Sequence, residues 1–443
     1  MELRDLIVTP LVIILVYGVA YMVRPLVSDQ INRVYFFPAL TVKIIGALAV
    51  GFIYQFYYGG GDTFTYHTWG SRKIWEAFLD SPITGLRLLF SDGTQDAEVF
   101  KYSSKIYFFA DPSSYAVVKV AAVMDLLTFS SYSATAILFA AFSFIGMWLF
   151  FLTFYEKYPH LHQWLAVAAF FIPSVFFWGS GILKDTITLG CVGASTFALS
   201  KIFIERKSTT RRWVILIMAL YGLWSVKIYI LLTFLPAAII WIFMSNLQLV
   251  RSLVLKMLLF PFVISVASIL GYFAIVKAGE DNTRYSIENL GQTARITAYD
   301  IRYYTGRYAG SGYELGELDG TLGSMFALSP QAINVSLFRP YLWEVRNPLM
   351  LLSALESLFF LIFSAYILIA KNVTVFKAFS NPDIAFSTLF SLSFAFAVGV
   401  STFNFGSLVR YKIPMLPFFL VTLVLILNHS NSERKFNELD TTE

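Results

Sequence analysis

The chain has few of the residues that build disulfide frameworks, metal clusters and soluble surfaces. Its 443 residues include one cysteine, Cys191, and four histidines, and only 14% are charged. A single cysteine argues against a disulfide framework, a zinc site or a thiol motif within one chain. An ordinary soluble domain has about a quarter of its residues charged, so the low charge argues against that class as well. The net charge of +5 is modest, and we do not interpret it as nucleic-acid binding.

Apolar residues are what the chain has in excess. Hydrophobic residues make up 57% of it and aromatic residues 18%, and the mean hydropathy is +0.66. Because apolar runs recur along the whole length, the sequence predicts a polytopic membrane protein rather than a soluble one with an anchor. The N-terminal run lacks a strongly basic start and a small-residue cleavage site, so we interpret it as a retained helix rather than a signal peptide.

The fold class that follows is all-α, a polytopic transmembrane helix bundle of about 11 spans. A helix needs about 20 residues to cross the hydrocarbon core. Such runs lie near 6–23, 36–58, 131–154, 163–179, 182–204, 212–227, 229–245, 254–277, 347–370, 382–402 and 412–428. The stretch 113–129 is too short and too charged for a span, and we predict an interfacial or dipping helix there.

Basic residues predict the orientation. The connection 200–213 holds five of them, Lys201, Arg206, Lys207, Arg211 and Arg212, and such clusters mark cytoplasmic loops. Alternation then predicts the N-terminus outside and the C-terminus inside. In a single membrane domain, 1–443, we expect a first large extracytoplasmic loop with interfacial helices at 59–130, a second at 278–346, and a cytoplasmic tail at 429–443.

The stretch YYGGGDTFTYHTWG, residues 57–70, stands at the start of the first large loop. Its three glycines let the backbone leave the preceding helix in conformations that other residues avoid. Asp62 would then lie at the outer membrane surface, and the residues after it have the pattern of an amphipathic interfacial helix. The alternative is a loop in which Asp62 or Thr63 caps a helix and His67 is solvated.

Cationic side chains at helix ends are expected on the same face. Lys184 follows a Gly-Ser-Gly turn at a helix start, where outward backbone N–H groups and a cation favour a phosphate. Three further cations, Lys227, Arg410 and Lys412, are predicted to lie on that side as well. Each alone could be an ordinary interfacial anchor, and their common side with Asp62 is the argument for a site.

The second large loop alternates arginine and tyrosine over 292–308, which suits an amphipathic helix, and its aromatic faces would suit a sugar or glycolipid. Arg339 stands where the chain re-enters the membrane and either packs under a site or anchors the helix. Glu356 falls inside the span 347–370. An intramembrane acid is a functional hypothesis by default, although a structural partner such as tyrosine or lysine is an equal alternative.

Four short motifs together resemble one family. They are GGGDTFTYH after the second span, PSVFFWGSGILKD at the turn that includes Lys184, KIYILLTFLP beginning at Lys227, and RYKIPMLPF at the start of the last span. The chain resembles the GT-C superfamily of integral-membrane glycosyltransferases, in the bacterial branch that uses polyprenyl-phosphate sugars and acts on envelope polysaccharide. The acid here follows the second predicted span, whereas the family places it after the first.

The resemblance implies an enzyme of the bacterial inner membrane with its active site facing the exterior. It would pass a sugar from a polyprenyl-phosphate carrier to a lipid, glycan or protein acceptor. Asp62 matches the general base, Lys184 and Arg410 match phosphate-side positions, and Lys227 is a weaker match. Lys412 is a further candidate for binding the lipid phosphate. Candidates for the substrate contact or its support are Tyr66, His67, Asp185, Arg339, Glu356 and Tyr411. No cofactor or tight metal site is predicted, because no second carboxylate lies near the motif; a divalent cation stays open, since some members use one.

Three other functions stay open on the sequence. A polysaccharide polymerase or ligase would share the lipid-phosphate chemistry and differ in its acceptor. A transporter or lipid flippase would place polar residues and broken helices at the midplane, and no internal repeat is evident. A non-catalytic envelope scaffold would tolerate the loss of Asp62, Lys184 and Arg410 together.

Overall fold

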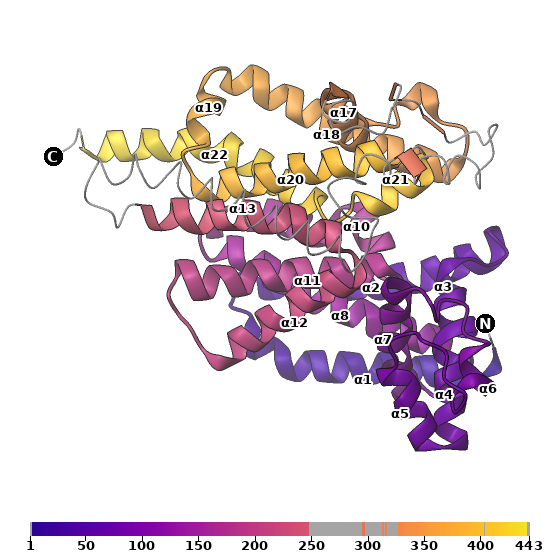
Figure 1. Ribbon diagram of the computed structural model, residues 1–443. Coiled ribbons are helices and arrows are strands. Elements are labelled where there is room, and N and C mark those ends of the chain that lie inside the picture. Colours follow the sequence, from indigo (N-terminus) through magenta and orange to yellow (C-terminus); the bar gives the residue numbers. More distant parts are fainter. Residues whose placement is uncertain are drawn as a thin grey trace. The chain divides into compact units, whose positions relative to one another are not determined.

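The computed structural model confirms the all-α prediction for the residues it describes. These are 2–247, 327–402 and 404–440, with 295–296, 312–313 and 315–316 between them; from 430 onward only the backbone is described. No strand occurs within these ranges, where an isolated antiparallel bridge joins Gly312 to Asn404. Figure 1 shows the helices with their labels.

Seven helices in the described ranges are long and apolar enough to cross a membrane, or up to eight if a bent pair counts as one span. The bent pair joins α21 (Phe405–Tyr411) to the first part of α22 (Leu416–Asp440) at 68°. The seven are α1 (Leu3–Val27), α2 continued by a π-helical turn (Arg33–Tyr57), α8 (Tyr132–Tyr155), α11 with its π-helical turn (Lys184–Ile204), α13 (Ile228–Asn246), α18 (Pro348–Lys371) and α20 (Pro382–Ser401). These helices indicate a membrane protein. The predicted span 254–277 lies outside the described residues, so the count of about 11 stays a prediction.

Two other predicted spans take a different form. The run 163–179 is divided into α9 (His162–Ala166), the π-helix η4 (Val167–Phe171) and α10 (Pro173–Trp178). The break falls at Ile172, which is extended at φ −70° and ψ 122°, because a following proline disfavours helical backbone. The run 212–227 forms α12 (Thr210–Val226), a helix of 17 residues.

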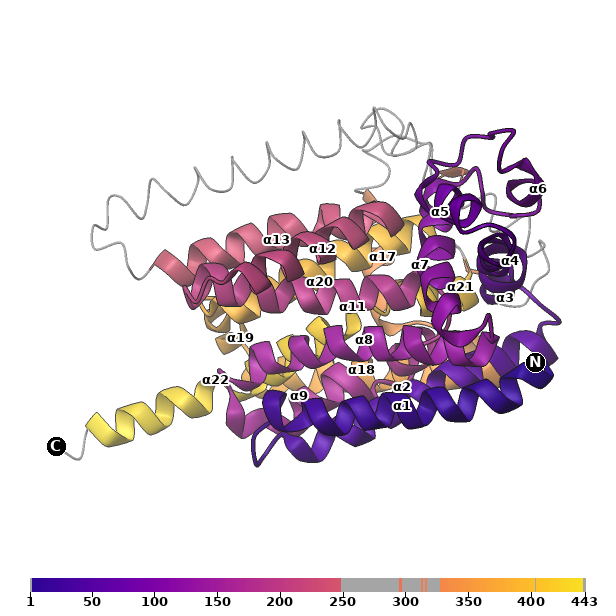
Figure 2. The same ribbon diagram turned by 90° about the horizontal axis from the view of Figure 1, so that it is seen from below.

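The chain divides into two compact units, and each is described by itself. The first comprises Met1–Ala198 and Thr209–Ile228. In it, α1 and α2 pack along α8, as Figure 2 shows. Helix α8 also touches α11 backbone to backbone, because a Cβ on Gly146 would lie 2.0 Å from the Gly190 carbonyl oxygen. Glycines at such a crossing let two membrane helices approach closely.

Short helices gather at one end of the first unit (Figures 1 and 2). They are α3 (Asp62–Tyr66), η2 (His67–Ser71), α4 (Arg72–Asp80), α5 (Pro82–Phe90), α6 (Phe100–Ser103) and α7 (Pro112–Thr128). Helix α4 confirms the amphipathic helix expected after Asp62, since it buries Ile74 and Ala77 while Asp80 is exposed. Leu79, which was expected on the apolar face, is 68% exposed. Helix α7 confirms the helix expected at 113–129.

The second unit comprises Leu199–Ser208 and Tyr229–Glu443. Its described helices besides α13, α18, α20, α21 and α22 are η5 (Ser200–Ile204), α17 (Ser329–Phe338), η8 (Leu342–Glu344) and α19 (Thr374–Ala378). Helix α20 packs against α17 and α22, and an aromatic core forms where Trp241 of α13 stacks on Phe386 at 4.3 Å. The amphipathic helix predicted at 292–308 lies outside the described residues except for 295–296.

Candidate functional site

Asp62 begins helix α3 directly after three glycines with left-handed backbone. Gly59, Gly60 and Gly61 have φ of 68°, 136° and 125°, which confirms the prediction that they let the chain leave the helix in conformations other residues avoid. Asp62 is half-buried in the first turn of α3. The next residue, Thr63, is fully buried, and its hydroxyl shares a hydrogen bond of 2.7 Å with that of Tyr132.

Lys184 stands at the start of α11, as the sequence predicts, and its side chain has partners from another helix. Its Nζ donates to Ser113 Oγ at 2.7 Å and lies 3.7 Å from Asp111 Oδ2. Both partners belong to the beginning of α7, where the Asp111 side chain also accepts from the Ser113 N–H. The Lys184 side chain is 19% exposed and that of Asp111 is 48% exposed, so water reaches this contact.

Four charged groups act electrostatically on the Lys184 ammonium. Asp111 has the largest effect, Lys227 and Asp185 follow, and Asp62 has the smallest of the four. The structure therefore brings together four residues that the sequence predicted for one site, and it adds Asp111. We call this set the Lys184 cluster; its members are Asp62, Asp111, Lys184, Asp185 and Lys227.

A buried ion pair forms the inner side of the Lys184 cluster. Lys227, at the end of α12, pairs with Asp185 in the first turn of α11. The two side chains are 6% and 0% exposed. A buried charge is stable only when it is paired and hydrogen-bonded, so each of these groups fixes the other. This pairing leaves Lys184, with its greater exposure, as the cation of the cluster that an external anion can reach.

Asp111 was missing from the predicted site, and its chemistry shows why. The sequence Asp-Pro-Ser-Ser at 111–114 is an ordinary helix start, with an acid at the N-cap and proline at the first helical position. Burial favours the neutral acid, but the charge of Lys184 and hydrogen bonds from Ser113 and Ser114 outweigh it and hold the pKa of Asp111 below its usual value. The signal available in the sequence was the N-cap itself; its proximity to Lys184 is a property of the fold.

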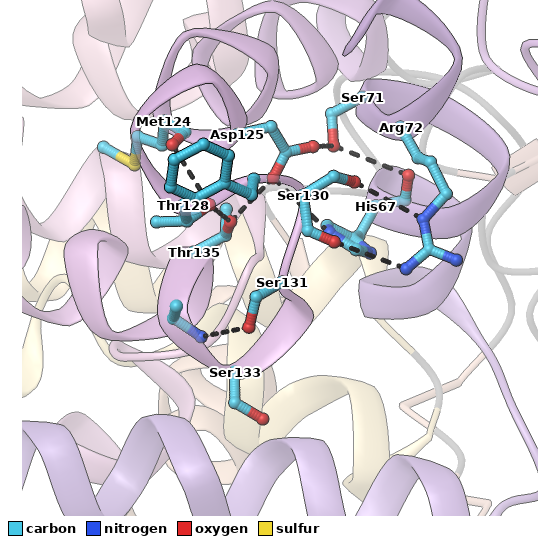
Figure 3. A network of polar contacts seen from close by, with 12 residues as sticks. His67, Ser71, Arg72, Met124, Asp125, Thr128, Ser130, Ser131, Ser133 and Thr135 are labelled. Atoms are coloured by element: carbon cyan, nitrogen blue, oxygen red, sulfur yellow. Dashed lines mark hydrogen bonds and ion pairs between the residues drawn. The ribbon is translucent and has the colours of Figure 1, made fainter. Parts of the chain in front are cut away.

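A second set of polar side chains lies deeper in the first unit and centres on Asp125 of α7 (Figure 3). Asp125 is fully buried. It accepts hydrogen bonds of 2.6 Å from Ser71 Oγ and from Thr135 Oγ1. Thr135 in turn shares a 2.7 Å hydrogen bond with Thr128. We call these residues, with His67, the Asp125 network; it joins η2, α7 and the start of α8.

His67 is buried in the Asp125 network, so the alternative that it is solvated is wrong. Its Nε2 lies 3.4 Å from Asp125 Oδ1, and neither ring nitrogen has a hydrogen-bond partner. Its ring meets that of Tyr132 edge-on at 5.4 Å. Tyr66, its neighbour, is buried with its ring 4.9 Å from that of Phe108. Both residues thus pack behind Asp62 and hold the segment that carries it.

The remaining predicted site residues belong to the second unit. Lys412 is fully buried and lies between α21 and α22. Its Nζ donates to Ser357 Oγ at 3.2 Å and lies 3.5 Å from the Arg339 carbonyl oxygen. Glu356, which is also buried, acts on it electrostatically. These residues form what we call the Lys412 cluster, and its geometry favours the structural alternative that the sequence left open for Glu356.

Arg339 is held by aromatic rings and an acid. Its guanidinium carbon lies 5.3 Å from the ring centre of Phe405 and 5.6 Å from that of Tyr313. Its Nε donates to both carboxylate oxygens of Glu344 at 3.1 Å. These contacts hold the Arg339 side chain inside the second unit, and its two predicted roles, packing under a site or anchoring the helix, stay predictions.

Arg410 and Tyr411 end α21 and are half-buried. The guanidinium of Arg410 lies 6.0 Å from the ring of Tyr411, a cation–π distance.

Across the described ranges, no three His, Cys, Asp or Glu side chains are grouped so as to hold a metal ion. In comparisons with protein-family models, curated proteins and solved structures, none matches this chain.

Proposed function

We propose that the chain is a membrane glycosyltransferase that moves a sugar from a polyprenyl-phosphate donor to an envelope lipid, glycan or protein acceptor. The observation that carries the proposal is the Lys184 cluster, in which the half-buried acid Asp62 lies within electrostatic reach of the water-accessible Lys184, each at the start of its helix. Sugar transfer from a lipid phosphate needs this combination: a base for the acceptor and a cation for the leaving phosphate.

Asp62 is the general base in this proposal. The acceptor hydroxyl oxygen attacks the anomeric carbon and forms the new C–O bond, while its proton passes to the Asp62 carboxylate. The bond between the anomeric carbon and the phosphate oxygen breaks, and its electron pair stays on the polyprenyl phosphate. The glycines before Asp62 support this role. Helix α3 begins at the acid, and the three residues that precede it have no side chains that could cover the carboxylate.

Lys184 holds the carrier phosphate in this proposal. Its ammonium faces the first turn of α7, and Lys184 also begins α11, so the positive end of that helix dipole favours a phosphate at the same residue. As the phosphate gains charge in the transition state, a cation already in place stabilises it without rearrangement. The buried ion pair of Asp185 and Lys227 fixes the first turn of α11, which carries Lys184.

The broader assignments belong to the same proposal. The chain would be a GT-C-type enzyme of the bacterial inner membrane, with about 11 spans, its N-terminus outside, its C-terminus inside and its site on the exterior face. Arg410 would contribute to the phosphate side. Lys412 has no part in phosphate binding in the proposal, because its side chain is fully buried.

The test is Asp62→Asn in vesicles that contain the purified chain and a polyprenyl-phosphate sugar. We expect transfer to fall by about a thousandfold, within the range that general base catalysis contributes, with unchanged expression and unfolding temperature. Asp96→Asn is the matched control, since Asp96 is an exposed acid of the same segment. Normal turnover by Asp62→Asn would remove the base assignment.

A transporter is the second candidate, and two observations favour it. The predicted span 163–179 is broken at Ile172, and Lys43 lies buried near the middle of the candidate span Arg33–Tyr57. Broken helices and ionisable residues at mid-depth are typical of transporters. The same vesicles separate the two functions: a transporter would move the lipid-linked sugar between leaflets without cleaving it and would tolerate Asp62→Asn.

A further inference from the structure

Lys43 is a fully buried lysine that neither the site nor the proposed mechanism uses. It belongs to α2, near the middle of a candidate span. Its Nζ donates to Ser143 Oγ at 3.0 Å, to the Gly179 carbonyl oxygen at 2.8 Å and to the Val175 carbonyl oxygen at 3.3 Å. All three acceptors are neutral, so Lys43 satisfies its three donors without a carboxylate.

Two of those acceptors are carbonyls at the end of α10: that of Val175, which also accepts the Gly179 N–H at 3.2 Å, and that of Gly179, the C-cap residue of the helix. A helix leaves its last carbonyls without partners, and inside a membrane water does not replace them. Helix α10 ends at Trp178, in the apolar run that the break at Ile172 divides. Lys43 supplies a donor to these carbonyls from a neighbouring helix. It is a cap contributed by a different segment of the chain.

The face of α2 around Lys43 is shaped for the same turn. A Cβ on Gly46 would lie 2.3 Å from the Phe176 carbonyl oxygen, and a Cβ on Gly181 would lie 2.7 Å from Val50 Cγ1. Lys43, Gly46 and Val50 are spaced three and four residues apart, so they share one face of the helix. Along that face α2 contacts first the end of α10 and then the glycine turn that follows it.

The turn leads directly into the Lys184 cluster, since only Ile182 and Leu183 separate Gly181 from Lys184. We propose that Lys43 is a positioning residue: by capping α10 it holds the turn 179–183 on α2 and thereby fixes where α11 begins. The effect on the turn stands on geometry alone. The consequence for phosphate binding by Lys184 rests on the proposed function.

A disulfide between Val50→Cys and Gly181→Cys measures how firmly the turn lies on α2. The two Cβ positions are 3.2 Å apart, close to the range of natural disulfides, and Cys191→Ala removes the native thiol. With Lys43 present we expect rapid cross-linking under mild oxidant. Lys43→Met should slow it about tenfold, the equivalent of losing one buried hydrogen bond.

Lys43→Gln tests whether the capping donor is what matters. Its amide can still donate to one carbonyl, so we expect cross-linking at a rate between those of Lys43 and Lys43→Met. All variants are compared as folded protein, by gel filtration and thermal unfolding of the full chain. The proposal is overturned if folded Lys43→Met cross-links at the rate seen with Lys43, or if folded Lys43→Gln cross-links no faster than Lys43→Met.

Gly46→Ala reaches the same contact without touching Lys43. Its methyl group would displace the Phe176 carbonyl, so we expect slower cross-linking, whereas the control Gly18→Ala has no atom within 4 Å of the added Cβ and should leave the rate unchanged. Equal rates in the two alanine variants would contradict the seating of the turn on α2.

The transfer assay then links the turn to Lys184. We expect Lys43→Met to raise the KM for the lipid-linked donor about tenfold with little change in kcat, and to add little in a Lys184→Ala background, because both changes weaken one contact. Full additivity of the two changes would contradict action through Lys184. If the unmodified chain transfers no sugar, the proposed function fails, while the cross-linking result still decides the role of Lys43.

Discussion

Lys184 and Lys412 were predicted for the same role, and the structure gives them different surroundings. The Lys184 side chain is 19% exposed and faces Asp111, which is itself 48% exposed. Lys412 is fully buried, with Ser357, the Arg339 carbonyl and buried Glu356 around it. A lysine at a helix end, whether the start or the finish, therefore does not define an anion site by itself. What matters is whether water, and so a ligand, can reach the ammonium.

The largest effect we expect is on stability, from Lys412→Met. The change removes a buried cation that acts electrostatically on buried Glu356, and removing one of two interacting buried charges costs about 3 kcal/mol or more. Thermal unfolding in detergent measures the loss. Adding Glu356→Gln should recover part of the lost stability, because glutamine carries no charge at this buried position. An unfolding midpoint unchanged by Lys412→Met would show that Lys412 does not stabilise the second unit through the Lys412 cluster.

Thr135→Val should have the next largest effect, in the first unit. It removes a hydrogen bond to fully buried Asp125, which costs about 1–2 kcal/mol. Thr196→Val is the matched control: Thr196 is equally buried, but its hydroxyl bonds to Val192 of its own helix, where little is lost. If the two valine variants have the same unfolding temperature, the hydrogen bonds of the Asp125 network do not stabilise the segment that follows Asp62.

The smallest effect is a pH dependence at the Lys184 cluster. Because Lys184 and two serines lower the native pKa of Asp111, its ionised form contributes stability above the unfolded pKa of about 3.9. That contribution is lost as the pH falls through the lower native pKa. The gap in unfolding temperature between the unmodified chain and Asp111→Asn should therefore narrow on acidification below pH 4. A gap that widens would mean that Lys184 does not hold Asp111 ionised.

The sequence predicted much of the fold because hydropathy reports directly on membrane-spanning helices. Hydropathy predicted the seven candidate spans, and the spacing of apolar residues predicted the amphipathic helix α4. The chain's exit from the helix before Asp62 was predicted from its three glycines. The break at Ile172 was accessible in principle from Pro173, but a continuous apolar run concealed it. Proline disfavours helix in the preceding residue, while apolar composition favours a span, and composition was given more weight.

The site was harder to predict because partners distant in the sequence decide its chemistry. Asp111 lies 73 positions before Lys184, by their numbers, and no local pattern joins them. Lys43 shows the opposite case: a lysine within an apolar run is a signal in itself, yet its acceptors are backbone carbonyls that no sequence pattern marks. Burial separates Lys184 from Lys412, and it follows from tertiary packing alone.

The most direct measurement is polyprenyl-phosphate binding by folded Lys184→Ala and Lys412→Met, compared with the unmodified chain by native mass spectrometry. The account predicts that Lys184→Ala weakens binding about tenfold, as expected for the loss of one charge-assisted contact. It predicts that folded Lys412→Met binds like the unmodified chain. Unchanged binding by Lys184→Ala, or a loss confined to Lys412→Met, would contradict the assignment of the phosphate site to the Lys184 cluster.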